Sequence, residues 1–279
     1  MDAGYAVRGD AMPGGEGGGR VAGSRLAVVK LGGGLVTSKE RPFSVRLRVV
    51  RSIGEELREA WRLGWRFVLV LGGGSYGHVV ASEYMREGLM DTGEALASIT
   101  RVMAELSSVV SEVLAEYGLA PVVYPPYAFC RPDGLRPNCD WELVSRSLWY
   151  DATPLIPGDA YPGYSGVRIV SGDELAIEAS CRLGADVLVY ATNVPGVLDE
   201  RGETIPYLSR PGLHDLLEHG MLRGGSGVDV TGGMYRKLKV ISELGCPGLR
   251  VCIVEGSRPG SVYAALRGRV SRGMTVIEL

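Results

Sequence analysis

Two glycine clusters, each placed directly after an apolar run, constrain the fold of this chain more than any other feature. Residues 32–34 follow the apolar run 26–31, and residues 72–74 follow the run 67–71. Short runs of this kind predict buried strands. Glycines at the end of a strand let the backbone turn sharply and approach a ligand closely, so both clusters predict strand-to-helix turns.

The same alternation of apolar runs and amphipathic stretches continues along the chain. It favours a three-layer α/β/α sandwich, in which helices cover both faces of a mainly parallel central sheet. One helix has its own start signal, because Ser171 and Glu174 have the spacing of a capping box. Further strands are predicted at residues 153–157, 167–170, 186–190, 249–254 and 275–277, and helices at 50–61, between 75 and about 117, and at 171–183, 231–244 and 257–266.

The beginning of the chain differs from the rest in composition. Residues 1–25 are rich in glycine and lack a hydrophobic period, which predicts a flexible tail, whereas residues 26–279 are predicted to form the folded domain. The glycines between residues 14 and 19 also suggest a phosphate loop, but no Lys-Ser or Lys-Thr pair follows them. The tail is therefore the preferred interpretation.

Charge and hydropathy exclude several classes of partner. The chain has 30 Lys and Arg against 32 Asp and Glu, with no long basic run, so no nucleic-acid partner is expected. No apolar run approaches the roughly 20 residues that span a bilayer, and the amino-terminus lacks the apolar segment of a signal peptide. We therefore expect a soluble, cytoplasmic protein with no membrane partner.

The five cysteines show no C-x-x-C spacing, which argues against a zinc site or a redox motif. Buried thiols are the preferred interpretation for this set. Only Cys130 and Cys139, which flank a loop rich in proline and arginine, are placed to close a small disulfide. Such bonds are uncommon in reducing cytosols.

The two glycine turns are predicted to bind phosphate groups. Ligands of a parallel sheet bind outside the carboxyl ends of its strands, where helix amino-termini present free N–H groups. Positive φ angles explain either cluster alone equally well, whereas two clusters at equivalent strand ends favour phosphate. The spacing of Gly72, Gly74 and Gly77 also fits a dinucleotide site, but the acidic residues that follow it fall in helical sequence rather than at a strand end.

Lysines are rare in this chain, and three of the four lie beside glycine turns. Lys30 ends the first strand and would be costly to bury without an anion. Lys39 and Lys237, taken singly, are typical of solvated surface residues. Together they favour phosphoryl transfer, which requires charge neutralisation more than covalent chemistry. Asp173, at the start of a predicted helix, either caps that helix or holds two lysines in position.

Five motifs together resemble the amino acid kinase superfamily, and within it the isopentenyl phosphate kinases. His78, which ends the motif GGGSYGH at residues 72–78, is typical of that branch. The resemblance covers residues 26–279 and implies the amino acid kinase fold, with the acceptor bound in the amino-terminal half and ATP in the carboxyl-terminal half of a homodimer. The motifs are residues 30–33 (KLGG), 72–78 (GGGSYGH), 171–173 (SGD), 192–197 (TNVPGV) and 229–237 (DVTGGM at its start).

The resemblance implies ATP and Mg²⁺ as cofactors and a prenyl monophosphate as the acceptor, with no protein ligand assigned to the metal. By this resemblance, the charge of the transferring phosphoryl group would be neutralised by Lys30, Lys39 and Lys237. Asp173 would organise the lysines, and His78 would hydrogen-bond the acceptor phosphate. The full expected contacts are Lys30, Gly32, Gly33, Gly34, Gly73, Asn193, Gly233 and Lys237 for ATP, and Gly72, Gly73, His78 and Gly172 for the acceptor.

A prenyl chain would also need an apolar pocket. The candidates follow the second glycine turn on the predicted helix, although plain core packing explains about half of them equally well. They are Tyr76, Val79, Val80, Tyr84 and Met85. Two segments depart from the family pattern: Gly34 stands where many members carry Ser, and residues 193–195 read Asn-Val-Pro instead of Asp-Val-Asp.

Other functions stay open on the sequence alone. One is a kinase of another small phosphate or phosphonate, such as a fosfomycin-type kinase. A second is a non-catalytic nucleotide-binding relative, and a dinucleotide oxidoreductase is the third. The three lysines and Asp173 argue against a pure binder, which has no need to stabilise a transition state.

Overall fold

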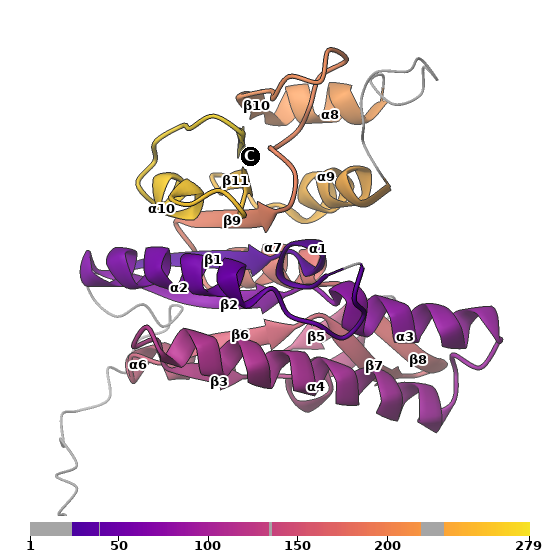
Figure 1. Cartoon of the computed structure of the whole chain (residues 1–279). Helices are drawn as coiled ribbons and strands as arrows, with labels where there is room; N and C mark the ends of the chain where they lie inside the picture. Colours follow the sequence, from indigo (N-terminus) through magenta and orange to yellow (C-terminus); the bar gives the residue numbers. More distant parts are fainter. Residues whose placement is uncertain (1–23, 39, 134–135, 219–231) are drawn as a thin grey trace, which may run out of the picture.

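The computed structural model describes residues 24–38, 40–133, 136–218 and 232–279 (Figure 1). Of the predicted tail, residues 1–23 lie outside this part of the chain. The described helices include none that is both long and apolar enough to cross a membrane. The strands are β1 (Arg25–Leu31), β2 (Trp65–Leu71), β3 (Pro121–Val123), β4 (Cys130–Asp133), β5 (Arg136–Cys139), β6 (Thr153–Pro157), β7 (Asp159–Gly163), β8 (Gly166–Val170), β9 (Val187–Thr192), β10 (Tyr207–Ser209), β11 (Arg250–Glu255) and β12 (Met274–Glu278).

Eight of these strands form the central sheet of the described structure, in the order β10-β12-β11-β9-β1-β2-β6-β3. Every neighbouring pair in it is parallel except β11 and β12. The carboxyl ends of β1, β2, β6, β9 and β11 therefore lie along one edge of the sheet. This confirms the prediction of a mainly parallel sheet.

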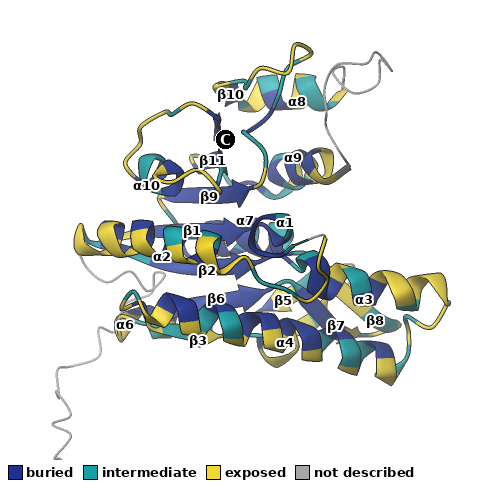
Figure 2. Ribbon diagram, viewed as in Figure 1, coloured by how far each residue is buried: buried dark blue, intermediate teal, exposed yellow. Residues whose placement is uncertain are grey.

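Helices cover both faces of the sheet (Figure 1). Strand residues alternate between two separate cores: Val29 packs with α2 and α4 on one face, and Val28 packs with α6, α7 and α9 on the other. Figure 2 shows the buried sheet between the two helix layers. The helices are α1 (Gly33–Val36), α2 (Leu47–Arg62), α3 (Gly74–Arg86), α4 (Gly93–Ala115), α5 (Pro126–Phe129), α6 (Trp141–Trp149), α7 (Gly172–Arg182), α8 (Arg210–Glu218), α9 (Gly232–Leu244) and α10 (Ser261–Leu266).

The residue at which a helix begins is set by local sequence in α7 and also by a tertiary contact in α10. The Ser171 hydroxyl accepts from the Glu174 N–H, and the Glu174 carboxylate accepts from the Ser171 N–H, which confirms the predicted capping box of α7. The helix predicted from residue 257 begins only at Ser261, because Gly260 has a φ of 83°. The buried Glu56 carboxylate of α2 accepts from the Gly260 N–H at 2.9 Å instead.

Two hairpins lie outside the central sheet. Strand β8 was expected within that sheet, from the run 167–170, but it pairs only with β7 in a separate antiparallel hairpin. The chain leaves the sheet at Gly158, whose N–H donates to the Leu71 carbonyl at 2.8 Å. The second hairpin pairs β4 with β5.

The interpretation of the cysteines as buried thiols is wrong for Cys181 and Cys246, whereas the small disulfide considered for Cys130 and Cys139 is present. Cys130 and Cys139 form a disulfide across β4 and β5, and Cys181 and Cys246 form a second one. The second bond joins the end of α7 to the segment after α9, and no spacing in the sequence indicates it. Only Cys252 is a buried thiol, and burial raises its pKa to about 11.

Candidate active site

The two glycine turns meet at the carboxyl edge of the sheet, because β1 and β2 are neighbours. A Cβ atom on Gly33 would lie 2.2 Å from the Gly74 nitrogen, and one on Gly72 would lie 2.6 Å from the Gly33 nitrogen. No other residue type fits such a contact. The glycines are therefore required by the contact between the turns themselves, whether or not a ligand is bound.

The first residue of α7, Gly172, also packs closely against the backbone at the end of β2. A Cβ on Gly172 would lie 2.9 Å from the Leu71 carbonyl oxygen, and one on Gly158 would lie 2.7 Å from the Gly172 nitrogen. The amino-termini of α3 and α7 therefore pack closely against the ends of β2 and β6. Both helix ends present free N–H groups and partial positive charge to the same space, which favours an anion there.

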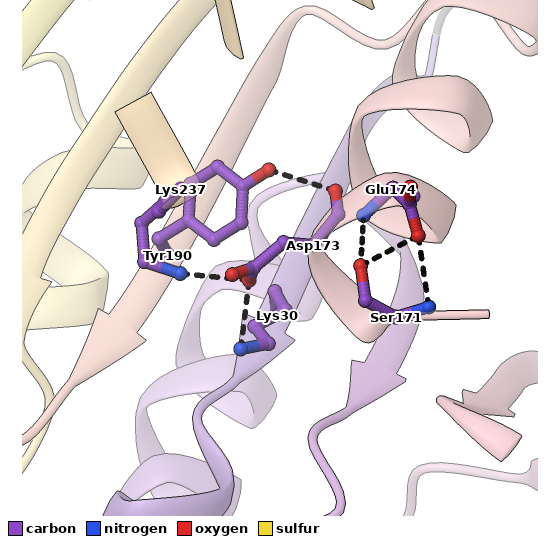
Figure 3. Close-up of polar contacts among 6 residues, drawn as sticks. All are labelled: Lys30, Ser171, Asp173, Glu174, Tyr190 and Lys237. Atoms are coloured by element: carbon purple, nitrogen blue, oxygen red, sulfur yellow. Dashed lines mark hydrogen bonds and ion pairs between the residues drawn. The ribbon is translucent and has the colours of Figure 1, made fainter. Parts of the chain in front are cut away.

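Lys30, Asp173 and Lys237 form one buried cluster beside these turns (Figure 3). The Nζ atoms of Lys30 and Lys237 lie 2.8 Å and 2.7 Å from the same Asp173 oxygen, Oδ1. The three side chains are 10%, 17% and 6% exposed, in the order Lys30, Asp173 and Lys237. They come from β1, α7 and α9, so the fold joins three distant parts of the sequence.

The charges in this cluster set its protonation. Burial alone would raise the pKa of Asp173, but the adjacent charges and hydrogen bonds of Lys237 and Lys30 hold it well below its usual range. Burial, followed by repulsion from Lys30, lowers the pKa of Lys237 to about 7. Asp173 is therefore a fixed anion that keeps two cations close together.

Tyr190 supports the cluster from β9, and sequence analysis did not identify it. Its hydroxyl donates to the Asp173 carbonyl at 3.0 Å, and the Nζ of Lys237 lies 4.3 Å from the centre of its ring (Figure 3). A cation over an aromatic face is attracted by the ring, most strongly when it is desolvated. The only sequence signal was an aromatic residue with a polar tip inside an apolar strand.

A cavity of about 420 Å³ opens beside the cluster. Its polar lining includes the glycine turn, the start of α7 and the charged groups Lys30, Asp173, His78 and Arg236. Its apolar lining residues are Ala81, Met85, Ile99, Ile169 and Val170.

His78 faces this cavity from the first turns of α3. Burial first, and then the positive charges of Lys30 and Arg236, lower the pKa of His78 below its ordinary value. His78 is nevertheless an exposed residue of α3, so contact with solvent limits this shift. An anionic ligand in the cavity would favour its protonated form and its N–H donors.

The predicted site residues separate into groups in space. Lys30, Gly72, Gly73, His78, Gly172 and Asp173 line the cavity. Asn193 lies beside the first turn, since a Cβ on Gly34 would lie 3.8 Å from its side-chain nitrogen. Gly32 packs against the end of β9, with its N–H donating to the Ala191 carbonyl at 2.8 Å. Gly233 is exposed at the start of α9, and Lys39 lies outside the described residues.

The predicted prenyl pocket was largely misplaced. Of its candidates only Met85 lines the cavity. Tyr76 and Val80 are buried in the core, and Tyr84 packs against that core, because these positions face α4 and the sheet. Ile99 from α4 and Ile169 from β8 stand in their place. No sequence signal indicated that two segments 70 positions apart would form one wall.

Asp159 and Arg236 also line the cavity and were not predicted. Asp159 follows a predicted strand end, and Arg236 precedes Lys237, so each carried a weak signal of position. A larger cleft, of about 720 Å³, lies near Pro195, Glu255 and Arg258. None of the clustered lysines or Asp173 lines that cleft, so it is not the site of the chemistry.

Comparison with known proteins gives a consistent result. The isopentenyl phosphate kinase of Methanocaldococcus jannaschii is 28% identical over 257 residues, covering 88% of this chain and 96% of that protein. The isopentenyl phosphate kinase of Haloferax volcanii is 33% identical over 252 residues, covering 85% and 98%. A solved structure described as "X-ray structures of isopentenyl phosphate kinase" superposes with a TM-score of 0.72 and 25% identity, covering 91% of this chain and all of that one.

A sequence model of the Amino acid kinase family matches residues 25–254, which include both glycine turns, His78, Asp173 and Lys237. The match spans most of the chain and every strand of the sheet except the last. With the fold and the lysine cluster described above, it establishes that this chain belongs to the amino acid kinase family.

Proposed function

We propose that this protein is an ATP-dependent kinase that converts isopentenyl phosphate into isopentenyl diphosphate. One observation carries the proposal: a single cavity of about 420 Å³ is lined both by glycine turns with cationic groups suited to a phosphate and by apolar side chains suited to a hydrocarbon chain. A prenyl monophosphate has the same division, with a charged head and a short hydrocarbon chain. The relatives named isopentenyl phosphate kinase support the same substrate.

The reaction needs positioning and charge neutralisation. An oxygen of the acceptor phosphate attacks the γ-phosphorus of ATP, a new P–O bond forms, and the bond to the β–γ bridging oxygen breaks to release ADP. The acceptor oxygen is nucleophilic once ionised, so no strong base is required. Lys30 and Lys237 each donate one N–H to Asp173 and retain others for phosphate oxygens.

The phosphates of ATP would also favour the charged form of Lys237, whose pKa is about 7 in the free protein. Bound ATP would thus charge the lysine that neutralises it. We assign ATP to the side of Asn193 and Gly233. The acceptor is assigned to the side of His78.

Mg²⁺ is proposed as the partner of ATP, where it would neutralise phosphate charge. The described residues contain no group of three His, Cys, Asp or Glu side chains suited to a metal. Such a donor set fits an ion held mainly by phosphate oxygens and water, as Mg²⁺ commonly is. Lys30 and Lys237, already paired with Asp173, would provide the fixed positive charge around it.

Other acceptors of the family fit the cavity less well. A uridylate base needs hydrogen-bond partners, and the carboxylates of acetylglutamate need cations beyond those that hold the phosphate. The wall formed by Ala81, Met85 and Ile99 offers neither. Fosfomycin is smaller and lacks a chain that would fill that wall.

An ADP-release assay tests the proposal. Isopentenyl phosphate, dimethylallyl phosphate, fosfomycin and uridylate are supplied separately with Mg-ATP to the full chain. We expect turnover with the two prenyl phosphates to exceed that with the others. Folded protein that turns over neither prenyl phosphate would refute the proposed function.

His78→Ala refines the test. Loss of a hydrogen bond to a charged group weakens binding by about 1.5–3 kcal/mol, so the KM for isopentenyl phosphate should rise about 10- to 100-fold. The KM for ATP should stay unchanged. Equal losses for both substrates would contradict the role given to His78.

We also propose that the protein works as a homodimer in the cytoplasm. The edge strand β3 supports the dimer, because Val122 and Val123 expose 40% and 38% of their surface beside unpaired backbone groups. Light scattering after gel filtration should give twice the chain mass. Cell fractionation tests the location.

A further inference from the structure

Asp159 occupies a central position in the acceptor cavity. It is the first residue of β7 and directly follows Gly158, whose backbone touches both the end of β2 and the start of α7. The carboxyl group therefore stands where the two helix amino-termini and the glycine turn converge. It lines the same cavity as Lys30 and His78.

The surroundings of Asp159 contrast with its burial. The residue is 2% exposed. Its Oδ1 accepts a hydrogen bond from the N–H of Ala160 at 2.7 Å, and the described residues provide it with no ion pair. A buried carboxylate with so little support is costly, and such groups normally hold a proton.

The charged neighbours do not neutralise this carboxyl. Within the cavity, Lys30 is bound to Asp173, and Glu174 is held in the capping box with Ser171. His78 and Arg236 line the cavity as well, and neither forms an ion pair with Asp159.

The elements packed against β7 are α4, α5, β4 and β8. Among the described residues, they contribute only Ile99, Ile169 and Val170 to the cavity. None of these titrates. Asp159 thus lines the ligand space without an ion-pair partner among the described residues.

We propose that Asp159 is a ligand of the acceptor phosphate in its protonated form, donating its O–H to a phosphate oxygen that does not attack ATP. This inference rests on the acceptor site proposed above. An ionised Asp159 would repel a dianionic phosphate, so the bound state requires the acid. Where the free carboxyl is ionised, one proton moves from solvent onto it as the acceptor binds, and no covalent bond changes.

The protonation of Asp159 takes place near neutral pH. Burial raises the pKa of Asp159 to about 7, with the Ala160 N–H opposing the rise. Above that pH the free enzyme must take up a proton before it binds the acceptor. The kcat/KM for the acceptor should therefore fall about tenfold per pH unit above pH 7.

Calorimetric titration with isopentenyl phosphate, without ATP, tests the proton uptake. Measurements at pH 8 in buffers of different ionisation enthalpy give the number of protons bound. Wild type should take up about one proton more than Asp159→Asn, and the difference should vanish near pH 6. His78→Gln serves as the second variant, because His78 can also gain a proton, whereas any uptake by Lys237 is common to wild type and Asp159→Asn.

Two outcomes overturn the proposal. One is equal proton uptake by wild type and Asp159→Asn, with the extra proton lost only in His78→Gln. The other is a pH profile of kcat/KM that keeps its slope in Asp159→Asn. The amide retains an N–H donor and cannot ionise, so we expect a shallower profile than in wild type and a preserved acceptor KM in Asp159→Asn, but a raised KM in Asp159→Ala.

Two further readouts keep the result interpretable. A purely structural role would impair Asp159→Asn and Asp159→Ala alike without altering the pH profile, and that result also rejects the proposal. If wild type binds no prenyl phosphate at all, the proposed function itself fails. Binding without Asp159-dependent proton uptake refutes only this inference.

Discussion

Asp173 and Asp159 are two carboxyl groups of one cavity with opposite properties. Asp173, at the start of α7, binds two lysine ammonium groups through one oxygen, and its pKa lies below the ordinary range. Asp159, at the start of β7, accepts one backbone N–H, and its pKa is raised to about 7. Both are largely buried. The partners of each group, rather than its depth, decide whether it is an anion or an acid.

This contrast suggests a division of labour. The start of α7 provides permanent negative charge that holds Lys30 and Lys237 together, where the proposed function would use them on the transferring phosphoryl group. The start of β7 provides a group whose charge depends on pH and ligand. Pairs of titratable groups whose environments separate their pKa values are typical of catalytic sites.

The largest effect on the free energy of unfolding is expected when the negative charge of Asp173 is removed. Asp173→Asn removes the anion and leaves two buried ammonium groups without compensation, which should lower the free energy of unfolding by about 3–5 kcal/mol. Chemical denaturation measures this change. Glu142→Gln, which alters an exposed ion pair, is the control and should leave the midpoint unchanged. A stability loss no greater than that of the control would contradict the role of Asp173.

The second effect concerns the lysines that Asp173 holds. Lys237→Met should lower kcat by about 10²–10³-fold, because it removes a positioned charge from the transition state. Lys239 lies two residues further along α9, with an exposed side chain, and Lys239→Met should leave kcat unchanged. Steady-state assays at saturating ATP compare the two variants. Similar rates in both would mean that burial of Lys237 serves only the fold.

The third effect measures the Asp159 side directly in the unliganded protein. The native pKa of about 7 exceeds the unfolded value of 3.8, so the native state binds more protons between these values and loses stability as pH rises toward 7. Relative to Asp159→Asn, wild type should lose on the order of 4 kcal/mol between pH 4 and pH 8. Denaturation curves at both pH values test this. A constant difference between the proteins would show that Asp159 ionises normally.

The smallest effect concerns the disulfide that secures the Asp173 side. Cys181 and Cys246 join the end of α7 to the segment after α9, and thereby tie the helices that carry Asp173 and Lys237. The double variant with serine at both positions should lose about 2–4 kcal/mol, because the bond closes a long loop. Removing the bond between Cys130 and Cys139, nine positions apart, should cost less. The reverse order, measured by thermal unfolding, would refute this account.

Local sequence predicted much of the fold. The apolar runs 26–31 and 67–71 became neighbouring central strands, and the capping box at Ser171 and Glu174 formed as expected. These signals are local, because strand length, helix period and caps depend on residues a few positions apart. The lysines beside the glycine turns also indicated the phosphate chemistry before any coordinates were known.

Other features were beyond any local pattern. The run 167–170 has the composition of a sheet strand, yet it forms a hairpin that supplies Ile169 to the acceptor cavity. The stripe containing Tyr76 and Val80 was expected to face a substrate, but α4 covers it. Which face of an element meets a ligand depends on what packs against its other face.

The sequence by itself determined most strands of the central sheet, the two glycine turns, and the lysines and Asp173 near them. Only the tertiary structure decided that Gly33 and Gly72 touch, that one Asp173 oxygen binds two lysines, and that Asp159 has no ion-pair partner in the part of the chain that the structure describes. Pairing and burial depend on which residues distant in sequence are brought within a few ångströms. For that reason one aspartate is held as an anion, whereas burial raises the pKa of another in the same cavity to about 7.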